Sequence, residues 1–537
     1  MTTSRREAIK RALAAGTALA PVAGTAATRA PAWGAGFDGQ RKADLGQGDY
    51  LNPVLAGDHP DPTILKDGDD YWMTFSSFEA LPALTIWHSR DLVNWVPVAS
   101  ALQRALGSVF AVDLCRHAGR YYLYVPVIPT AVSTGLDGQP GIYVIHAEHP
   151  TGPWSEPVSL GIAGYIDPGH VVGEDGRRYL FLSGISRVRL RADGLATDGP
   201  IEPAYDGWHY PDDWVTEAYA LEGPKLLRRG DWFYLVSAVG GTAGPPTSHM
   251  VIVARSRSVH GPWQNCPHNP IVRTRSASER WWSRGHASLV QGPQGDWWLV
   301  YHGYENGYRT LGRQMLLEPV AWKADGWPRA LGGDLSRPLR KPRGGQPGPH
   351  GAPLSDDFSV PRFGRQWSFY DPGAREPQRA RLDAGALVIQ GKGRSPADCS
   401  PLTCVVGDHA YEISVELELS GAAHGGLLLF YGRRLFCGMG HDGQRMSTWR
   451  SGLEQGFWRE PAGIGTRWQL RIVNDHHIVT MHYRRDAGQP WTRHGLRMDT
   501  SGHDTNAADE LLSLRPALFA AGDGEVRFRD FRYRALP

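Results

Sequence analysis

The sequence predicts an all-β protein: a five-bladed β-propeller followed by a C-terminal antiparallel β-sandwich of jelly-roll type. Three observations support this prediction. A strand headed by aromatic residues recurs five times, helical periodicity is scarce, and a Pro/Gly-rich run precedes a region of alternating strands. The 537 residues are enough for two or three domains, and 20 Trp and 20 Tyr suit extended strands.

Residues 1–33 are expected to form an export signal of the twin-arginine type. Arg5 and Arg6 precede the run ALAAGTALAPVAGTAA, which is short and rich in Ala and Gly. That run does not predict a membrane span, and no later apolar run is long enough to cross a bilayer. We therefore expect an exported protein, periplasmic or extracellular, that has no membrane span.

The charge and the cysteine content limit which partners, metal sites and disulfides are expected. With 21% charged residues and a net charge of +2, the composition does not suggest a polyanion partner such as a nucleic acid. The five cysteines have no metal-binding spacing. Cys399 and Cys404 could form one local disulfide in an oxidising compartment, and the odd count leaves at least one free thiol.

The repeat predicts the propeller, over residues 48–340. A turn containing Gly or Asp leads each time into an aromatic-headed strand, and the strands are spaced by about 50 to 65 residues, close to one four-stranded blade. The strands are expected to begin near Tyr71, Tyr121, Tyr179, Trp232 and Trp297.

A polar residue recurs ahead of each aromatic strand, where the first strand of a blade is expected to begin. In chain order these residues are Asp61, Asp113, Asp167, Glu222 and His286. First strands line the central channel of a propeller, so these side chains are expected to converge at one mouth of the channel. An Asp-Pro pair by itself is more often a turn, but repetition at matching positions favours a site.

Converging carboxylates raise one another's pKa values, and such a pair suits glycoside hydrolysis. One carboxylic acid protonates the leaving oxygen, and one carboxylate activates water. Pro60 and Pro62 around Asp61, and Pro168 after Asp167, stiffen the backbone that carries these groups.

The C-terminal part begins after a Pro/Gly-rich linker, residues 341–353. Residues 354–537 contain segments with period-two alternation, which predict antiparallel sheets in a sandwich. These segments are YEISVELEL from Tyr411, WQLRIVNDHHIVTMHYRR from Trp468, and VRFRDFRYR near the end.

Several blocks between Asn52 and Leu339 resemble glycoside hydrolase family 43, in its branch of β-xylosidases and α-L-arabinofuranosidases. They are NPVLAGDHPDPTIL, YIDPGHVVGEDGRRYL, EGPKLLRRGDWFYLVSAVGGT, GHASLVQGPQGDWWLVYHG and LGRQMLLEPVAW. The resemblance implies an inverting hydrolase on a five-bladed propeller. The part from DDFS onward resembles the β-sandwich that often follows it.

The resemblance also implies roles for four residues. Asp61 looks like the general base, Glu222 like the general acid, and Asp167 like the carboxylate that keeps the acid's pKa high and orients it. Arg313 matches the arginine that binds sugar hydroxyls in the innermost subsite. An inverting enzyme separates its acid and base by about 6.5–9.5 Å to seat a water molecule.

Further positions are candidates for binding. His286 matches an axial histidine that helps to hold a structural calcium ion or a water cluster in the channel, and no cofactor is expected for catalysis. Asp113 and Phe78 are candidates for substrate binding, although the block VFAVDL departs from the family's tryptophan-containing form. Trp208 and Trp214, in a loop before the proposed acid, could wall a subsite or pack beneath the loop.

The function expected is an exo-acting release of terminal pentose, xylose or arabinofuranose, from plant-wall oligo- or polysaccharides. Action on galactose or galactofuranose linkages stays open, because these sugars differ by a few pocket contacts. A non-catalytic carbohydrate-binding propeller is disfavoured by the presence of all three acids. Retaining fructan hydrolases usually carry Arg-Asp-Pro and Glu-Cys blocks. This chain has Ile-Asp-Pro and Glu-Gly-Pro blocks instead, so it does not resemble that class.

Overall fold

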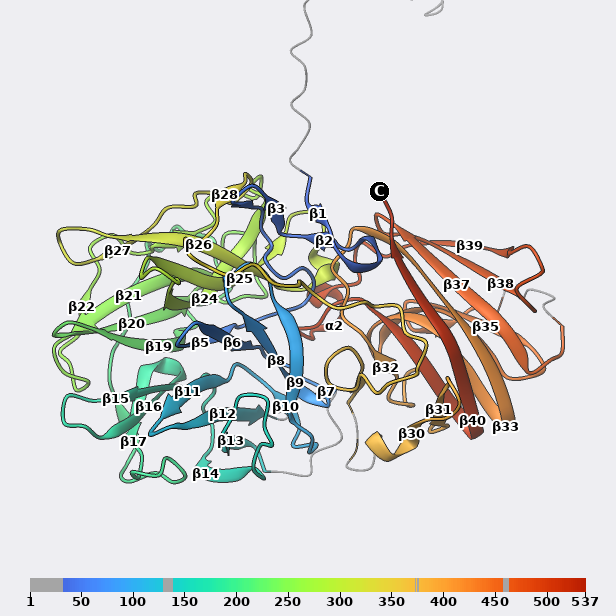
Figure 1. Ribbon diagram of the computed structural model, residues 1–537, viewed down its shortest axis with the longest axis horizontal. Helices are drawn as coiled ribbons and strands as arrows, with labels where there is room; N and C mark the ends of the chain where they lie inside the picture. Colours follow the sequence, from blue (N-terminus) through green and yellow to red (C-terminus); the bar gives the residue numbers. More distant parts are fainter. Residues whose placement is uncertain (1–31, 129–138, 372, 374–375, 457–462) are drawn as a thin grey trace, which may run out of the picture. The chain divides into compact units, whose positions relative to one another are not determined.

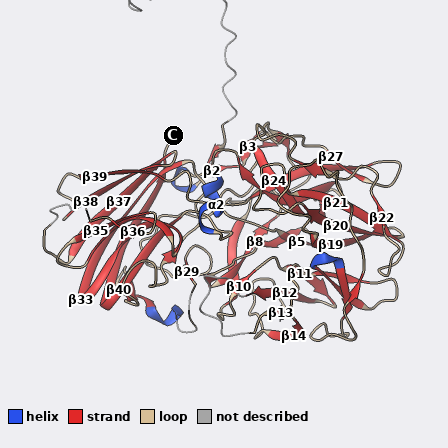
Figure 2. Cartoon of the chain, turned by 180° about the vertical axis from the view of Figure 1, so that it is seen from behind, coloured by secondary structure: helices blue, strands red, loops and turns tan. Residues whose placement is uncertain are grey.

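The structure is a computed structural model that describes residues 32–128, 139–371, 373, 376–456 and 463–537. Strands dominate these residues, as Figures 1 and 2 show, which confirms the all-β class. Helix in the described part is confined to α2 (Thr505–Ala508) and the 3-10 turns η1 (Phe37–Gly39), η2 (Ser183–Ile185), η3 (Arg309–Leu311) and η4 (Glu376–Arg379). The predicted export signal lies outside the described residues except for its last two positions.

Five antiparallel sheets follow one another along residues 63–330. The first holds β5 (Thr63–Asp67), β6 (Asp70–Thr74), β8 (Ala83–Ser89) and β9 (Val96–Leu102). The second holds β10 (Ser108–Val109), β11 (Asp113–His117), β12 (Arg120–Ile128), β13 (Gly141–Ala147) and β14 (Val158–Ile162). The third holds β15 (Gly169–Val172), β16 (Arg178–Leu182), β17 (Ser186–Arg189) and β18 (Glu202–Pro203). The fourth holds β19 (Glu222–Arg229), β20 (Trp232–Val239), β21 (Met250–Ser256), β22 (Gln264–Asn265) and β23 (Val272–Arg273), and the fifth β24 (Trp281–Gln291), β25 (Trp297–Glu305), β26 (Gln314–Trp322) and β27 (Pro328–Ala330).

The five sheets form a closed ring. Strands β5, β11, β15, β19 and β24 contact one another in that order, and β24 returns to β5. The aromatic strands predicted from the repeat are β6, β12, β16, β20 and β25, so these strand predictions are confirmed. Their aromatic side chains fill the space between sheets; Tyr71, Tyr124, Tyr234 and Tyr301 are fully buried.

Four short strands precede the five sheets, and one of them pairs with a strand that follows the sheets. They are β1 (Gly34–Ala35), β2 (Arg41–Lys42), β3 (Asp44–Gly46) and β4 (Asp49–Tyr50), and β4 pairs with β28 (Leu339–Arg340) through Tyr50 and Leu339. The predicted linker, residues 341–353, contains no strand or helix. The Gln346 and Gly351 N–H groups donate to the carbonyls of Arg90 and Trp95, which holds the linker against the first sheet.

The C-terminal region, residues 354–537, is built on two long strands, β33 (Ala410–Gly432) and β40 (Arg515–Ala535), that pair along most of their length. The other strands are β29 (Ser368–Tyr370), β30 (Ala380–Leu382), β31 (Leu387–Gln390), β32 (Leu402–Thr403), β34 (Leu435–His441), β35 (Met446–Arg450), β36 (Leu453–Glu454), β37 (Arg467–Asp475), β38 (Ile478–Arg484) and β39 (Thr492–Asp499). Alternate residues of β33 and β37 are buried in one apolar core. The strands predicted from Tyr411, from Trp468 and near the C-terminus are therefore confirmed.

The ring and the C-terminal region share secondary structure. Strand β7 (Ala80–Leu81), from the loop after β6, pairs with β29. Phe78, two residues earlier, belongs to the apolar core of the C-terminal region. The two parts are therefore packed as one body rather than tethered.

The structure decides between the two states left open for Cys399 and Cys404. Both are free, buried thiols, and they form no local disulfide with each other. Both lie in the apolar core, where cysteine packs as a small hydrophobic side chain.

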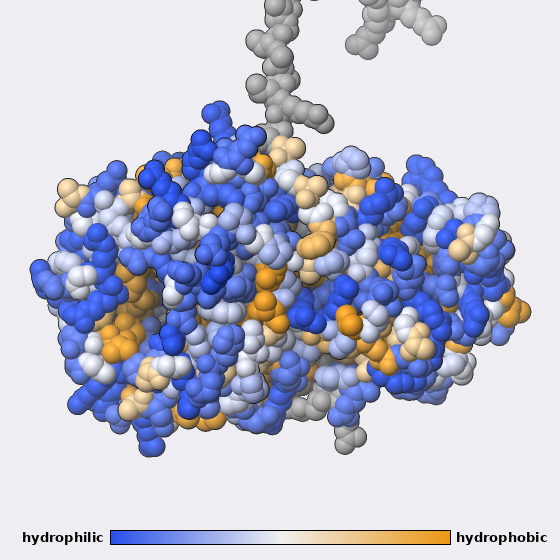
Figure 3. All heavy atoms as spheres, viewed as in Figure 1, coloured by the Kyte–Doolittle hydropathy of each residue, from blue (hydrophilic) through white to orange (hydrophobic). Residues whose placement is uncertain are grey.

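Figure 3 shows a largely hydrophilic face whose apolar residues form scattered small patches. No helix within the described ranges is long and apolar enough to cross a membrane.

Candidate active site

The ring brings the three predicted carboxylates to the same end of its inner strands. Asp61 lies two residues before β5, Asp167 two residues before β15, and Glu222 is the first residue of β19. His286 differs from the expectation, because it lies in the middle of β24 rather than at its head. Strand β24 begins earlier and shifts register between Trp282 and Gly285 and again between Gly285 and Ser288.

The backbone at these positions is unusual. Asp61, Asp167 and His286 have φ values of 57°, 55° and 56°, in the left-handed region. Asp and His enter that region more readily than most residues, yet such a conformation costs on the order of 1–3 kcal/mol and persists only where the surroundings impose it. Three instances in one cluster indicate a site whose side-chain directions are fixed by the fold.

Asp61 is held as an anion. Its Oδ1 accepts a hydrogen bond from Arg313 Nη1 at 2.9 Å, and its Oδ2 accepts one from Ser76 Oγ at 2.5 Å. Burial opposes ionisation, but the charges of Arg313 and His286 hold the pKa of Asp61 well below its usual value. The lowered pKa keeps this buried carboxylate ionised near neutral pH, where it can accept a proton.

Glu222 has the opposite character. Its side chain is 22% exposed, and His249 Nε2 lies 3.1 Å from its Oε1. Burial raises the pKa of Glu222 to about 6, and the Asp61 charge adds to this, while His286 and Arg313 oppose it. The two carboxyl groups therefore differ in protonation between the pKa of Asp61 and about pH 6.

Asp167 and His286 form a buried pair beside Glu222. Asp167 Oδ2 accepts the Gly223 N–H at 3.0 Å and lies 3.4 Å from His286 Nε2. Burial raises the pKa of Asp167, and repulsion from Glu222 and Asp61 adds to the effect. Burial opposes the charging of His286, but the carboxylates around it raise its pKa. Only glycine fits at position 223, because a Cβ there would lie 2.9 Å from the His286 ring and φ is 63°.

Two more histidines complete the site, and the sequence analysis missed them. The His302 ring lies 5.2 Å from the His249 ring in a tilted arrangement and 6.1 Å from the His286 ring in a stacked one, measured between ring centroids. His302 Nδ1 accepts the Asp61 N–H at 3.0 Å. Burial lowers the pKa of His249 to about 3 and that of His302 well below its usual value, so both rings are neutral. The sequence signal was the buried strand pattern of β25, in which a histidine among apolar residues needs a partner.

The buried side chain of Arg313 has hydrogen-bond donors left for a ligand. Its guanidinium lies over the Phe78 ring, 5.3 Å from the centroid, and only 2% of the residue is exposed. Nε and Nη2 have no hydrogen-bond partner among the described residues. Buried donors of this kind require partners, which the hydroxyl groups of a bound sugar would supply. The structure thus brings Arg313 and Phe78 into the same site as Asp61.

Asp113 is placed differently. Its Oδ1 accepts a hydrogen bond from Lys225 Nζ at 2.7 Å, and its Oδ2 accepts the His170 N–H at 2.8 Å. Lys225 Nζ also donates to the carbonyl of Pro168, which follows Asp167. Asp113 therefore supports the backbone that carries Asp167, and a direct substrate contact stays a prediction.

Trp208 and Trp214 pack on a local apolar cluster with Met250 and Ile252. Their ring centroids are 6.1 Å apart, and Arg273 covers the Trp214 ring at 3.2 Å. Both rings are half-buried. This arrangement favours packing beneath the loop over a sugar-binding wall.

The expected calcium ion can be checked against the chemistry of the residues present. Calcium takes six to eight oxygen ligands. In the part of the chain that the structure describes, no group of three or more His, Cys, Asp or Glu side chains is arranged to hold a metal. Because calcium also binds backbone and water oxygens, the channel ion at His286 stays a prediction.

Comparison with known proteins identifies relatives of the same kind. The family model of glycosyl hydrolases family 43 matches residues 50–328, slightly more than half of the chain. A non-reducing end α-L-arabinofuranosidase, BoGH43B, of Bacteroides ovatus is 32% identical over 65% of this chain and 66% of its own length. A xylan 1,3-β-xylosidase of Vibrio sp is 33% identical over 52% of this chain and 56% of its own length. The chain thus matches less than two thirds of the length of either relative.

Solved structures resemble more of the chain. The GH43 BlXynB protein from Bacillus licheniformis superposes with a TM-score of 0.80 and 26% identity, covering 91% of this chain and 100% of that protein. A xylan β-1,4-xylosidase from Bacillus halodurans superposes with a TM-score of 0.78 and 25% identity, covering 90% and 99%. These likenesses extend over the C-terminal region as well as the ring.

Proposed function

Because the chain belongs to glycosyl hydrolases family 43, we propose that it is an exo-acting glycosidase that releases terminal pentose from plant-wall oligo- or polysaccharides. The observation that carries this proposal is that the pKa values of two carboxyl groups in one site are shifted in opposite directions. The pKa of Asp61 is held well below its usual value, and that of Glu222 is raised to about 6. Glycoside hydrolysis needs one ionised and one protonated carboxyl group.

The proposed mechanism inverts the anomeric centre. Asp61 accepts a proton from water as the water attacks the anomeric carbon, and Glu222 donates its proton to the departing glycosidic oxygen. Burial and the Asp61 charge raise the pKa of Glu222, Asp167 orients the acid, and Arg313 binds sugar hydroxyls through Nε and Nη2. The anomer that forms first, followed by proton NMR, tests inversion; a product that keeps the substrate's configuration would contradict it.

The sugar is proposed to be xylose or arabinofuranose, because the relatives carry the names of β-xylosidases and arabinofuranosidases. The test is to incubate the protein with xylo-oligosaccharides, arabinan and arabinoxylan and to identify the released sugar, with Asp61→Asn as the control. Release of one pentose that disappears in the variant supports the proposal. Release of no pentose from any of the three substrates would overturn it.

We further propose that the five sheets are the blades of a propeller and that the C-terminal region is a β-sandwich. The ring of inner strands and the long β33–β40 pair support these assignments. Export through the twin-arginine route is proposed from Arg5 and Arg6. Replacing both arginines by lysine should retain the protein in the cytoplasm of an expressing bacterium, which cell fractionation would show.

The pH dependence of activity follows from the two carboxyl groups. Glu222 must be protonated, so kcat/KM is expected to fall as pH rises through about 6. Asp61 must be ionised, and because its pKa is well below the usual value, the acidic limb lies at much lower pH. A kcat/KM profile at constant ionic strength measures both limbs. A plateau that continues to pH 8 would contradict the assigned acid.

Replacing Arg313 by lysine is expected to lower kcat/KM by about 10- to 100-fold, because lysine keeps the charge beside Asp61 but loses the free Nε and Nη2 donors. Arg178→Lys is the matched control. Arg178 is also buried, but it bonds His170 and Tyr124 away from the carboxylates. The control should lower the melting temperature and leave kcat/KM near the wild-type value. An unchanged kcat/KM in Arg313→Lys would contradict the role of Arg313.

A further inference from the structure

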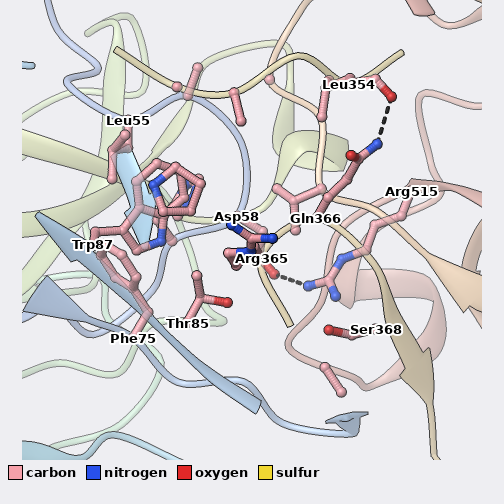
Figure 4. A pocket seen from close by; sticks show the side chains of 18 of the residues that line it. Leu55, Asp58, Phe75, Thr85, Trp87, Leu354, Arg365, Gln366, Ser368 and Arg515 are labelled. Atoms are coloured by element: carbon pink, nitrogen blue, oxygen red, sulfur yellow. Dashed lines mark hydrogen bonds and ion pairs between the residues drawn. The ribbon is translucent and has the colours of Figure 1, made fainter. Parts of the chain in front are cut away.

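We propose that a pocket between the ring and the C-terminal region is a second saccharide site, which takes one neutral sugar ring and is coupled to the catalytic carboxylate Asp61. We call it the interdomain pocket (Figure 4). Its walls include Phe75, Thr85 and Trp87 from the ring, and Arg365, Gln366 and Ser368 from the C-terminal region. The binding itself can fail or succeed independently of the hydrolytic function, whereas the coupling to Asp61 rests on the proposed function.

The size of the interdomain pocket suits a single sugar ring. Its volume is about 170 Å³. Pockets for drug-sized molecules begin at about 300 Å³, and a single water molecule needs only about 10–15 Å³. The space is therefore too large for one or two ordered waters and too small for an oligosaccharide.

One wall of the pocket is aromatic. The His59 ring makes edge contacts with Phe75 and Trp87, at centroid distances of 5.0 and 5.2 Å. The Phe75 and Trp87 rings lie on the same side in Figure 4, and Gln366 and Arg515 face them from the C-terminal region. An aromatic wall opposite polar side chains is the arrangement that binds the apolar face and the hydroxyl groups of a sugar.

Charges in the pocket are neutralised within the protein. Asp58 pairs with Arg515 at 2.7 Å, and Arg41 pairs with Glu305 at 2.8 Å. Burial lowers the pKa values of His59 and His350 to about 4, so both are neutral at pH 7. The remaining lining charges, those of Arg365 and Asp408, have opposite signs. A neutral ligand rich in hydroxyl groups suits this lining better than an anion or a cation.

Two residues that line the pocket form hydrogen bonds with residues of the candidate active site. Ser76 lines the pocket, and its Oγ donates to Asp61 Oδ2 at 2.5 Å. Asp58 also lines the pocket, and its Oδ1 accepts the Arg313 N–H at 3.1 Å. A sugar that bonds Ser76 or Asp58 competes with these contacts. We therefore expect the bound sugar to lower kcat, as a noncompetitive component of inhibition.

The test measures binding of D-xylose and L-arabinose by titration calorimetry to the full chain carrying Arg313→Met, which weakens the active-site subsite. One bound sugar per chain is expected, and the added change Trp87→Leu should abolish it. Trp154→Leu is the matched control, because Trp154 is a half-buried tryptophan outside the pocket. Circular dichroism and melting temperature check that each variant folds.

Either of two results of the calorimetry would overturn the proposed binding. Arg313→Met could bind no sugar while the wild type binds one, or its binding could survive Trp87→Leu. A second measurement does not depend on the Arg313 variant: wild-type inhibition by the free pentose should be partly noncompetitive, and Trp87→Leu should make it purely competitive. Purely competitive inhibition of the wild type would show that the pocket is not coupled to Asp61.

Discussion

Replacing Glu222 by glutamine is expected to lower kcat on a xylo- or arabino-oligosaccharide by about 10³-fold. The amide keeps the shape of the side chain beside His249 but cannot donate a proton to the leaving oxygen. Steady-state hydrolysis, measured from the released pentose, checks the loss. The fall in activity near pH 6 should disappear in the same variant, because the titrating group is gone.

The leaving group supplies the internal control for Glu222→Gln. A nitrophenyl glycoside departs as a stable phenolate and needs little protonation, so its hydrolysis should fall much less. Glu148→Gln is the matched surface variant, since Glu148 is exposed and pairs with Arg120. Equal losses on both substrates would contradict the role of Glu222 as the acid.

Replacing Asp61 by asparagine is expected to lower kcat by about 10³-fold or more. The variant loses the proton acceptor for water and leaves the charge of Arg313 without its 2.9 Å partner. Added azide needs no base. It should restore turnover by bonding to the anomeric carbon while the glycosidic bond breaks and the leaving oxygen takes the Glu222 proton. The product should be a glycosyl azide of inverted configuration, identified by NMR.

Asp113→Asn tests whether Asp113 stabilises the fold without taking part in catalysis. Removing the Asp113 charge leaves Lys225 buried without its partner, which should destabilise the fold by about 3–5 kcal/mol. Denaturant unfolding measures that cost. At a temperature where the variant is folded, kcat should stay within about tenfold of the wild type, since Asp113 is not placed to transfer a proton. If Asp61→Asn kept a comparable kcat, the assignment of the base would be wrong.

Local patterns were sufficient to predict the strands. The aromatic repeat located β6, β12, β16, β20 and β25, and strict alternation located β33 and β37. These signals work because side chains of a strand alternate between two faces and each face has one environment. The short, irregular connections, such as the register shifts of β24, have no such period and could not be placed.

The site was predicted in part. Asp61, Asp167 and Glu222 were recognisable because a repeat places equivalent residues at equivalent positions in space. His302 and His249 lie outside that repeated position; the apolar pattern of β25 was the one signal for His302, and no pattern marked His249. Trp208 and Trp214 carried a signal that suited either a subsite or packing, and only their contacts with Met250 and Ile252 favoured packing.

By itself, the sequence determined the all-β class, the order of the strands and the carboxyl groups available for chemistry, because these depend on local period and residue type. The tertiary structure decided which carboxyl group is ionised: Asp61 and Glu222 differ through buried neighbours such as Arg313, not through their own chemistry. It also decided that Arg515 holds Asp58, 457 residues away along the chain. Such a contact arises from the packing of two regions, and no local pattern encodes it.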